Sequence, residues 1–144
     1  MAFKKPKRVA VNHPPFLLYI VDDDEDDLLF IHNAFQAVGF DNVCKGFYDG
    51  HDFLEHLKYK ASEESPDIVV LDYEMPRMNG KELLKKLRSF PEFNSIPIIF
   101  YSDRINDRLE EELKQLGAFC CIKKGITPGD QLKFARTVTE FLKK

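Results

Sequence analysis

Acidic side chains stand at the ends of two largely apolar runs in the sequence. Asp22 and Asp23 follow the run 16–21, and Asp72 follows the run 67–71. Carboxylates held close together repel one another, so they either take up protons or share a cation. Magnesium suits such a site because it prefers oxygen ligands and binds through one or two carboxylates while keeping several waters. One of these aspartates could then attack phosphorus and form an acyl phosphate.

A hydroxyl and a cation occupy the ends of two further apolar runs. Ser102 follows the run 96–101, and Lys123 and Lys124 follow the run 118–122. The hydroxyl could donate a hydrogen bond to a phosphoryl oxygen, and a lysine could neutralise charge on a transferring phosphoryl group. The ends of four separate runs therefore carry groups suited to phosphoryl transfer.

The apolar runs alternate with segments of helical periodicity. We expect strands at 16–21, 43–48, 67–71, 96–101 and 118–122, and helices near 28–38, 50–60, 79–90, 107–116 and 128–142. This alternation predicts an α/β fold with a doubly wound, open parallel sheet covered by helices on both faces, because each crossover is right-handed. The flavodoxin-like (βα)5 arrangement with strand order 2-1-3-4-5 is the common solution at this size.

The predicted topology also predicts where the chemistry lies. In open sheets of this kind, ligands bind beyond the carboxyl ends of the strands, at the point where the strand order reverses. That point falls between the first and third strands, which are about 4.8 Å apart when adjacent. Asp22, Asp23 and Asp72 should therefore converge, although about fifty residues separate the first two from the third.

Several segments resemble response-regulator receiver domains of the single-domain, chemotaxis-regulator-like kind found in two-component systems. The segment 67–80, Asp-Ile-Val-Val-Leu-Asp-Tyr-Glu-Met-Pro-Arg-Met-Asn-Gly, resembles the phosphoacceptor segment of that family. Residues 19–23 are similar to its acidic metal-binding pair, 98–102 to its fourth strand and switch Ser/Thr, and 117–124 to its fifth strand and lysine. The resemblance covers about residues 16–143.

The resemblance implies that Asp72 accepts a phosphoryl group from a histidine kinase or phosphotransfer protein. Ser102 would hydrogen-bond a phosphoryl oxygen and Lys124 would pair with the phosphoryl group. The chain would catalyse only its own phosphorylation and autodephosphorylation and would otherwise not be an enzyme. It would signal through protein–protein interaction with an unknown downstream partner, on the surface of the fourth helix, fifth strand and fifth helix, or by onward phosphotransfer. We expect no output domain and a monomer or weak homodimer.

The resemblance also implies a Mg2+ site. Asp23 would bind the ion directly, Asp22 mainly through water, and the backbone carbonyl of Glu74 would complete a shell that includes Asp72. In the loop that follows, Asn79 would cap the next helix with its side-chain oxygen, and Gly80 would permit the tight entry into that helix.

Five positions depart from the family pattern or vary within it. Asp103 stands where a small residue is usual, so it could crowd a phosphoryl group or face solvent. Cys121 replaces a switch aromatic, and Gly125 replaces a proline and should loosen its turn. Glu74 and Arg104 have opposite charges two residues beyond the acceptor and the switch hydroxyl. Our hypothesis is that they interact across the site and slow attack by water.

Composition bounds the remaining expectations. The 144 residues fit one domain, with 44% hydrophobic and 31% charged residues, and the net charge of -3 predicts no strong attraction to nucleic acid or anionic lipid. Residues 1–15 combine four basic residues with three prolines, so we expect a flexible basic arm before a receiver domain at 16–144. No apolar run approaches the roughly 20 residues of a membrane span, and the three cysteines lack CxxC spacing. We therefore expect a cytoplasmic protein with reduced cysteines.

Some alternative functions remain possible, and others are excluded by the residues present. A phosphorylation-independent, receiver-like interaction module is the main alternative, because Asp103, Cys121 and Gly125 depart from the family. A haloacid-dehalogenase-type phosphatase fits only in part, at Asp22-x-Asp24. An EF-hand loop fails for want of its glycine and glutamate. The acids at 24–27 are expected to serve the following helix as cap and first-turn residues. The histidines, which are His13, His32, His51 and His56, are expected on the arm or on helix surfaces and receive no role.

Overall fold

Parallel strands with buried side chains form the centre of the molecule. The computed structural model describes residues 16–39, 43–60 and 64–143, so the arm predicted at 1–15 lies outside the described residues. The elements are β1 (Leu17–Val21), α1 (Glu25–Ala37), β2 (Val43–Phe47), α2 (Gly50–Lys60), β3 (Ile68–Leu71), α3 (Gly80–Ser89), β4 (Ile98–Ser102), α4 (Asp107–Gln115), β5 (Cys120–Lys123) and α5 (Pro128–Lys143). Each predicted strand and helix is present. The structure adds a short 3-10 turn at Pro91–Phe93.

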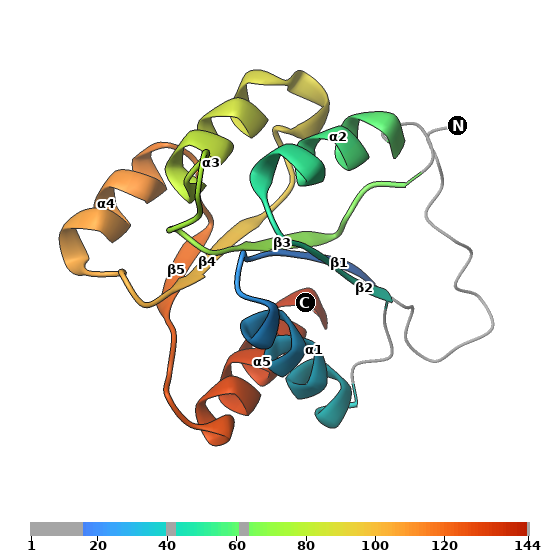
Figure 1. The fold of residues 1–144 in the computed structure, drawn as a ribbon, viewed down its shortest axis with the longest axis vertical. Helices are drawn as coiled ribbons and strands as arrows, with labels where there is room; N and C mark the ends of the chain where they lie inside the picture. Colours follow the sequence, from blue (N-terminus) through green and yellow to red (C-terminus); the bar gives the residue numbers. More distant parts are fainter. Residues whose placement is uncertain (1–15, 40–42, 61–63, 144) are drawn as a thin grey trace.

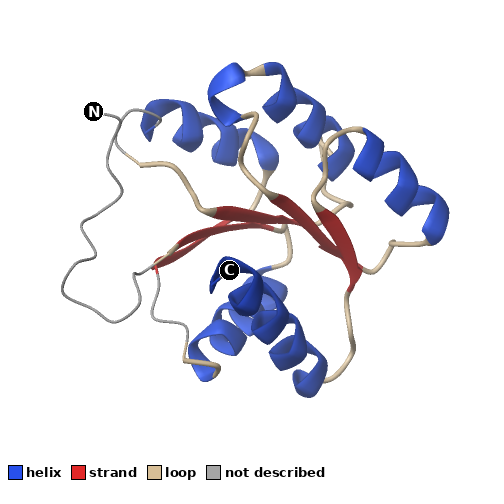
Figure 2. Ribbon diagram, turned by 180° about the vertical axis from the view of Figure 1, so that it is seen from behind, coloured by secondary structure: helices blue, strands red, loops and turns tan. Residues whose placement is uncertain are grey.

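The sheet has the order β2-β1-β3-β4-β5, and all its pairs are parallel. The predicted flavodoxin-like order is therefore confirmed. Figure 1 shows α1 and α5 against one face of the sheet and α2, α3 and α4 against the other, and Figure 2 shows the same layers from behind. Across the described residues, none of the helices has the length and apolar character needed to cross a membrane.

The helices cover both faces of the inner strands, which explains the continuous apolar runs. Every residue of β3 and β4 is buried, as are all residues of β1 after Leu17. Alternate side chains enter different cores. Tyr19, Val21, Leu71 and Phe100 face α2, α3 and α4. The opposite core contains Leu18, Ile20, Phe35, Tyr101 and Phe134.

The adjacent cysteines of β5 follow this alternation. Cys120 packs against the core under α1 and α5, whereas Cys121 packs against the core on the other face. Their side chains therefore point to opposite faces of the sheet, as adjacent residues of a strand do. All three cysteines are free thiols, and Cys44 packs in the same core as Cys120.

The expectation for His56 was wrong. This side chain is not on an open helix surface but half-buried between α2 and the sheet, with its Nε2 3.2 Å from the Tyr19 hydroxyl. The Tyr19 hydroxyl donates to Glu64, and Lys45 Nζ lies 3.3 Å from the same carboxylate. Burial and the hydrogen bond to Glu64 raise the pKa of Tyr19 far above its usual value. His56 turns inward because it lies three residues after the core residue Phe53, on the same helix face.

Candidate functional site

The ends of β1 and β3 bring the predicted aspartates together. Val21 pairs with Leu71 in the parallel ladder, and the backbone N–H of Asp72 donates to the Val21 carbonyl at 2.9 Å. One carboxylate oxygen from each of Asp22, Asp23 and Asp72 lies within 4.8 Å of the others. The convergence predicted from the strand ends is therefore present in the structure.

Two of these carboxylates are buried, and burial controls their protonation. Asp22 is 1% exposed and Asp72 is 9% exposed, whereas Asp23 is open to solvent. Burial raises the pKa of Asp22 to about 6, against the opposing hydrogen bonds from Lys124 and from the backbone of Asp24. Burial also raises the pKa of Asp72, and Lys124 and the Ser102 hydroxyl act in the opposite direction. Burial disfavours the ionised form of these carboxylates, and added positive charge would favour that form.

The donor set fits a divalent cation with oxygen ligands. Three carboxylates from two neighbouring strand ends supply hard oxygen donors, and exposed Asp23 leaves one side of the group open to solvent. The positive charge already present comes from Lys124, but its ammonium is shared among several carboxylates. Asp22, Asp23 and Asp72 could therefore hold Mg2+ or a similar ion.

Lys124 reaches into this group from the residue after β5. Its Nζ lies 2.7 Å from Asp22 Oδ2, 2.8 Å from Asp27 Oδ2 and 3.8 Å from Asp72 Oδ1, and its side chain is 10% exposed. The nearby carboxylates raise the pKa of Lys124 above its usual value, although burial opposes the shift. The ammonium therefore stays charged at the centre of the acidic site.

Asp27 is the member of the site that sequence reasoning missed. Asp24 caps α1 as predicted, because its Oδ1 accepts from the backbone N–H groups of Asp26 and Asp27. The carboxylate of Asp27, however, pairs with Lys124 as well as lying in the first helical turn. One signal was available: α1 begins directly beyond the carboxyl end of β1, so its first turn borders the site.

Ser102 and its neighbours border the same site. Ser102 ends β4 and is 1% exposed, and its Oγ accepts from the backbone N–H of Arg104 at 3.3 Å. A hollow of about 510 Å3 opens over Asp72 and is also lined by Ser102, Asp103 and Lys124. Asp103 lines this hollow and is exposed, which agrees with the expectation that it faces solvent; whether it crowds a phosphoryl group stays a prediction.

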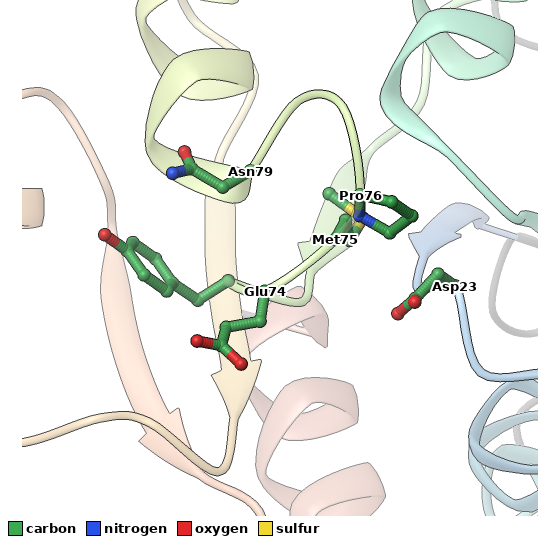
Figure 3. A pocket seen from close by; sticks show the side chains of 6 residues that line it. Asp23, Glu74, Met75, Pro76 and Asn79 are labelled. Carbon is green, nitrogen blue, oxygen red and sulfur yellow. The ribbon is translucent and has the colours of Figure 1, made fainter.

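The loop after Asp72 has the predicted helix cap. Asn79 Oδ1 accepts from the backbone N–H of Glu82, and Glu82 Oε1 accepts from that of Asn79, each at 2.9 Å. A Cβ on Gly80 would lie 2.6 Å from the Asp72 carbonyl oxygen, so only glycine allows α3 to start this close to β3. Figure 3 shows Asp23 at the end of β1 and Glu74, Met75 and Pro76 on this loop, around an adjoining hollow of about 420 Å3.

The departures at Cys121 and Gly125 have local structural reasons. Cys121 is paired with Phe100 in the sheet register, and the buried Phe100 ring occupies the core on that face. Gly125 was expected to loosen its turn. Instead, Asp130 Oδ2 accepts from the backbone N–H groups of Ile126 and Thr127, at 3.0 and 3.1 Å, and its Cβ lies against Gly125. The turn after Lys124 is therefore braced by Asp130.

Comparisons with known proteins agree with this geometry. The model of the family described as "Response regulator receiver domain" matches residues 18–136. The polar-differentiation response regulator DivK of Brucella anthropi is 27% identical over 128 residues, which cover 89% of this chain and 97% of DivK. The aligned segments span 61%, 7%, 40% and 63% of the lengths of the first four curated relatives.

Solved structures show the same fold. The phosphorylated cyanobacterial phytochrome response regulator RcpA superposes with a TM-score of 0.81 at 23% identity, covering 89% of this chain and 94% of RcpA. The Mn2+-bound response regulator Rcp1 gives a TM-score of 0.78 at 19% identity, covering 88% of this chain and 94% of Rcp1. The strand order, the acidic group at the strand ends and the family match agree: this chain belongs to the response regulator receiver domains of two-component signalling.

Proposed function

We propose that Asp72 accepts a phosphoryl group from a phosphohistidine of a sensor histidine kinase or phosphotransfer protein. The observation that carries this proposal is the position of Asp72, a buried carboxylate grouped with Asp22 and Asp23 and bordered by Lys124 and Ser102. A similar structure is that of a phosphorylated response regulator, which supports the same chemistry for this chain.

In the proposed transfer, a carboxylate oxygen of Asp72 attacks the phosphorus of the phosphohistidine. An O–P bond forms and the N–P bond breaks, and its electron pair stays on the imidazole nitrogen, which takes up a proton. Lys124 pairs with the phosphoryl oxygens and the Ser102 hydroxyl donates to one of them. A divalent cation at this site supplies positive charge that neutralises the same oxygens.

Asp22, Asp23 and Asp72, with the backbone carbonyl of Glu74, are the proposed ligands of that cation, and Mg2+ is the proposed ion. The donor chemistry supports this set, because Mg2+ prefers carboxylate and carbonyl oxygens and retains waters. The structure of a Mn2+-bound response regulator of the same fold supports divalent metal binding in general.

The proposed output is a population shift that changes binding to an unknown downstream protein. We place that partner on the surface of α4, β5 and α5, and propose a cytoplasmic protein that acts as a monomer or weak homodimer without binding nucleic acid. In this proposal the chain catalyses only its own phosphorylation and autodephosphorylation.

Incubation with Mg2+ and a small acyl-phosphate donor tests the proposal. Intact-mass spectrometry should show the addition of one phosphoryl group, and chelation of the metal should prevent it. Asp72→Asn should abolish the addition, whereas Asp103→Asn, which removes a carboxylate from the rim of the same hollow, should retain it. An unmodified wild-type protein, under conditions that phosphorylate another receiver, would rule the proposal out.

The position of Cys121 favours one alternative, a receiver-like interaction module that does not need phosphorylation. Cys121 provides no aromatic ring to couple β5 to the Ser102 end of β4. The two functions differ in the response of the α4, β5 and α5 surface to the donor. Phosphorylation-dependent signalling predicts donor-induced changes in amide chemical shifts there in wild type but not in Asp72→Asn. Equal spectra would support the alternative.

A further inference from the structure

Lys124 is held by two carboxylates that come from different elements. Its Nζ lies 2.7 Å from Asp22 Oδ2, at the end of β1, and 2.8 Å from Asp27 Oδ2, in the first turn of α1. Asp72 Oδ1 is 3.8 Å away, beyond the range of an N–H···O hydrogen bond. The ammonium therefore donates hydrogen bonds to Asp22 and Asp27 and makes only a longer ion pair with Asp72, the proposed acceptor.

The start of α1 fixes the direction of the Asp27 carboxylate. Asp24 satisfies the first backbone N–H groups of the helix, and its own N–H donates to Asp22 Oδ1 at 2.9 Å. The first turn is thereby attached to Asp22. The Asp27 side chain, which is 31% exposed, does not act in the cap and pairs with Lys124 instead.

Asp27 differs from the other carboxylates around Lys124 because it has no role in the proposed metal binding or phosphoryl transfer. Asp22 is a proposed metal ligand, and Asp72 is the proposed acceptor. Asp27 neither binds the cation nor accepts the phosphoryl group in this proposal, so it can keep its ion pair with Lys124 when both are bound. Lys124 must turn from Asp27 toward the phosphoryl oxygens, and the charge-assisted hydrogen bond to Asp27 opposes that movement.

We propose that Asp27 is a positioning residue that holds Lys124 away from Asp72 in the unphosphorylated protein and thereby slows phosphoryl transfer. The kinetic part of this inference rests on the proposed function, whereas the positional part rests on the geometry of Lys124 alone. The two parts can therefore be tested separately.

The kinetic test compares Asp27→Asn with Asp26→Asn. Both substitutions remove one negative charge from the first turn of α1, but Lys124 pairs with Asp27 and not with Asp26 among the described residues. With a small acyl-phosphate donor and saturating Mg2+, Asp27→Asn should raise the maximal rate of phosphorylation about five-fold, the scale of a partly exposed ion pair. Asp26→Asn should change it less than about two-fold. Asp27→Glu should return the rate toward that of wild type.

The positional test is a crystal structure of each metal-free variant. In Asp27→Asn the distance from Lys124 Nζ to Asp72 Oδ1 should contract from 3.8 Å to hydrogen-bond range, and in Asp26→Asn it should stay unchanged. Asp27→Ser serves as a second variant if Asp27→Asn does not fold. An unmoved ammonium, or equal rates for the two variants, overturns the inference. If no variant or wild type is phosphorylated but the ammonium moves as expected, the proposed function fails while Asp27 keeps its positioning role.

Discussion

Arg104 Nη2 lies 3.1 Å from Glu74 Oε2, and the pair joins the loop after β3 to the loop after β4. Glu74 is two residues beyond Asp72, and Arg104 is two residues beyond Ser102. Both side chains line the hollow over Asp72. The predicted contact between these opposite charges is therefore present, and its effect on the lifetime of a phosphoryl group is open to test.

Removing either member of this pair should shorten the lifetime of the phosphorylated protein. Glu74→Ala and Arg104→Ala each open the rim of the hollow to water, and the effect should be at most about five-fold because exposed ion pairs contribute up to about 1 kcal/mol. Decay after removal of the donor, followed by intact mass, measures it. The double variant should resemble each single variant, and Arg108→Ala is a charge-matched control on α4. Unchanged lifetimes in both single variants would contradict the hypothesis.

Asp22 should make the stability of the metal-free protein depend on pH. Its pKa is about 6 in the folded protein and 3.8 in the reference state, so between these values the folded protein binds more protons than the unfolded chain. The free energy of unfolding should therefore fall as pH rises from about 4 to 6, by an amount on the order of 3 kcal/mol from this group. The contribution that favours folding is complete below pH 4 and is lost above pH 6.

Urea unfolding at a series of pH values measures this dependence. Asp22→Asn should reduce the fall between pH 4 and 6, because asparagine does not titrate whereas Asp72, whose pKa burial also raises, still does. Asp103→Asn controls for the loss of one carboxylate at the same hollow. Chelator must be present throughout, since a bound cation would favour the ionised form. Parallel pH profiles for wild type and Asp22→Asn would show that burial of Asp22 is not the cause.

Gly80 should be far less replaceable than Gly129. A Cβ on Gly80 would lie 2.6 Å from both the Asp72 carbonyl oxygen and Phe100 Cε1, whereas one on Gly129 would meet nothing closer than 3.7 Å. Gly80→Ala should lower the free energy of unfolding by about 1–3 kcal/mol through overpacking. Gly129→Ala should be neutral or stabilising by up to about 1 kcal/mol, since alanine favours helices. Equal urea midpoints for the two variants would contradict this close approach.

The sheet and the acidic group were predictable because each depends on local sequence. β3 and residues 98–101 of β4 are apolar because helices cover both faces of the sheet, and the acids come directly after the ends of β1 and β3. Parallel strands end at one edge of the sheet, so Asp22 and Asp72 had to meet once the order was known. The family resemblance added the roles of individual residues, which spacing alone does not supply.

The contacts of Asp27 and His56 were not predictable in the same way. An acid in a first helical turn is explained equally well by the helix dipole, so Asp27 gave no sign of pairing with a lysine 97 residues away. His56 depends on where the Tyr19 hydroxyl and Glu64 meet under α2. Both contacts follow from the relative placement of elements distant in sequence.

The close packing of Asp130 against Gly125 leads to a further prediction. A Cβ on Gly125 would lie 2.1 Å from Asp130 Cβ, so Gly125→Ala must displace a side chain whose carboxylate holds Ile126 and Thr127. We expect a loss of about 1–3 kcal/mol in the free energy of unfolding. Asp130→Gly also costs stability, because it removes the hydrogen bonds at the start of α5. In the double variant Gly125→Ala/Asp130→Gly, the alanine methyl no longer meets the Asp130 side chain. The loss in the free energy of unfolding of the double variant, measured by urea unfolding, should therefore be smaller than the sum of the losses of the two single variants. If the two losses in free energy are strictly additive, the Asp130 side chain is not the reason why glycine is needed at position 125.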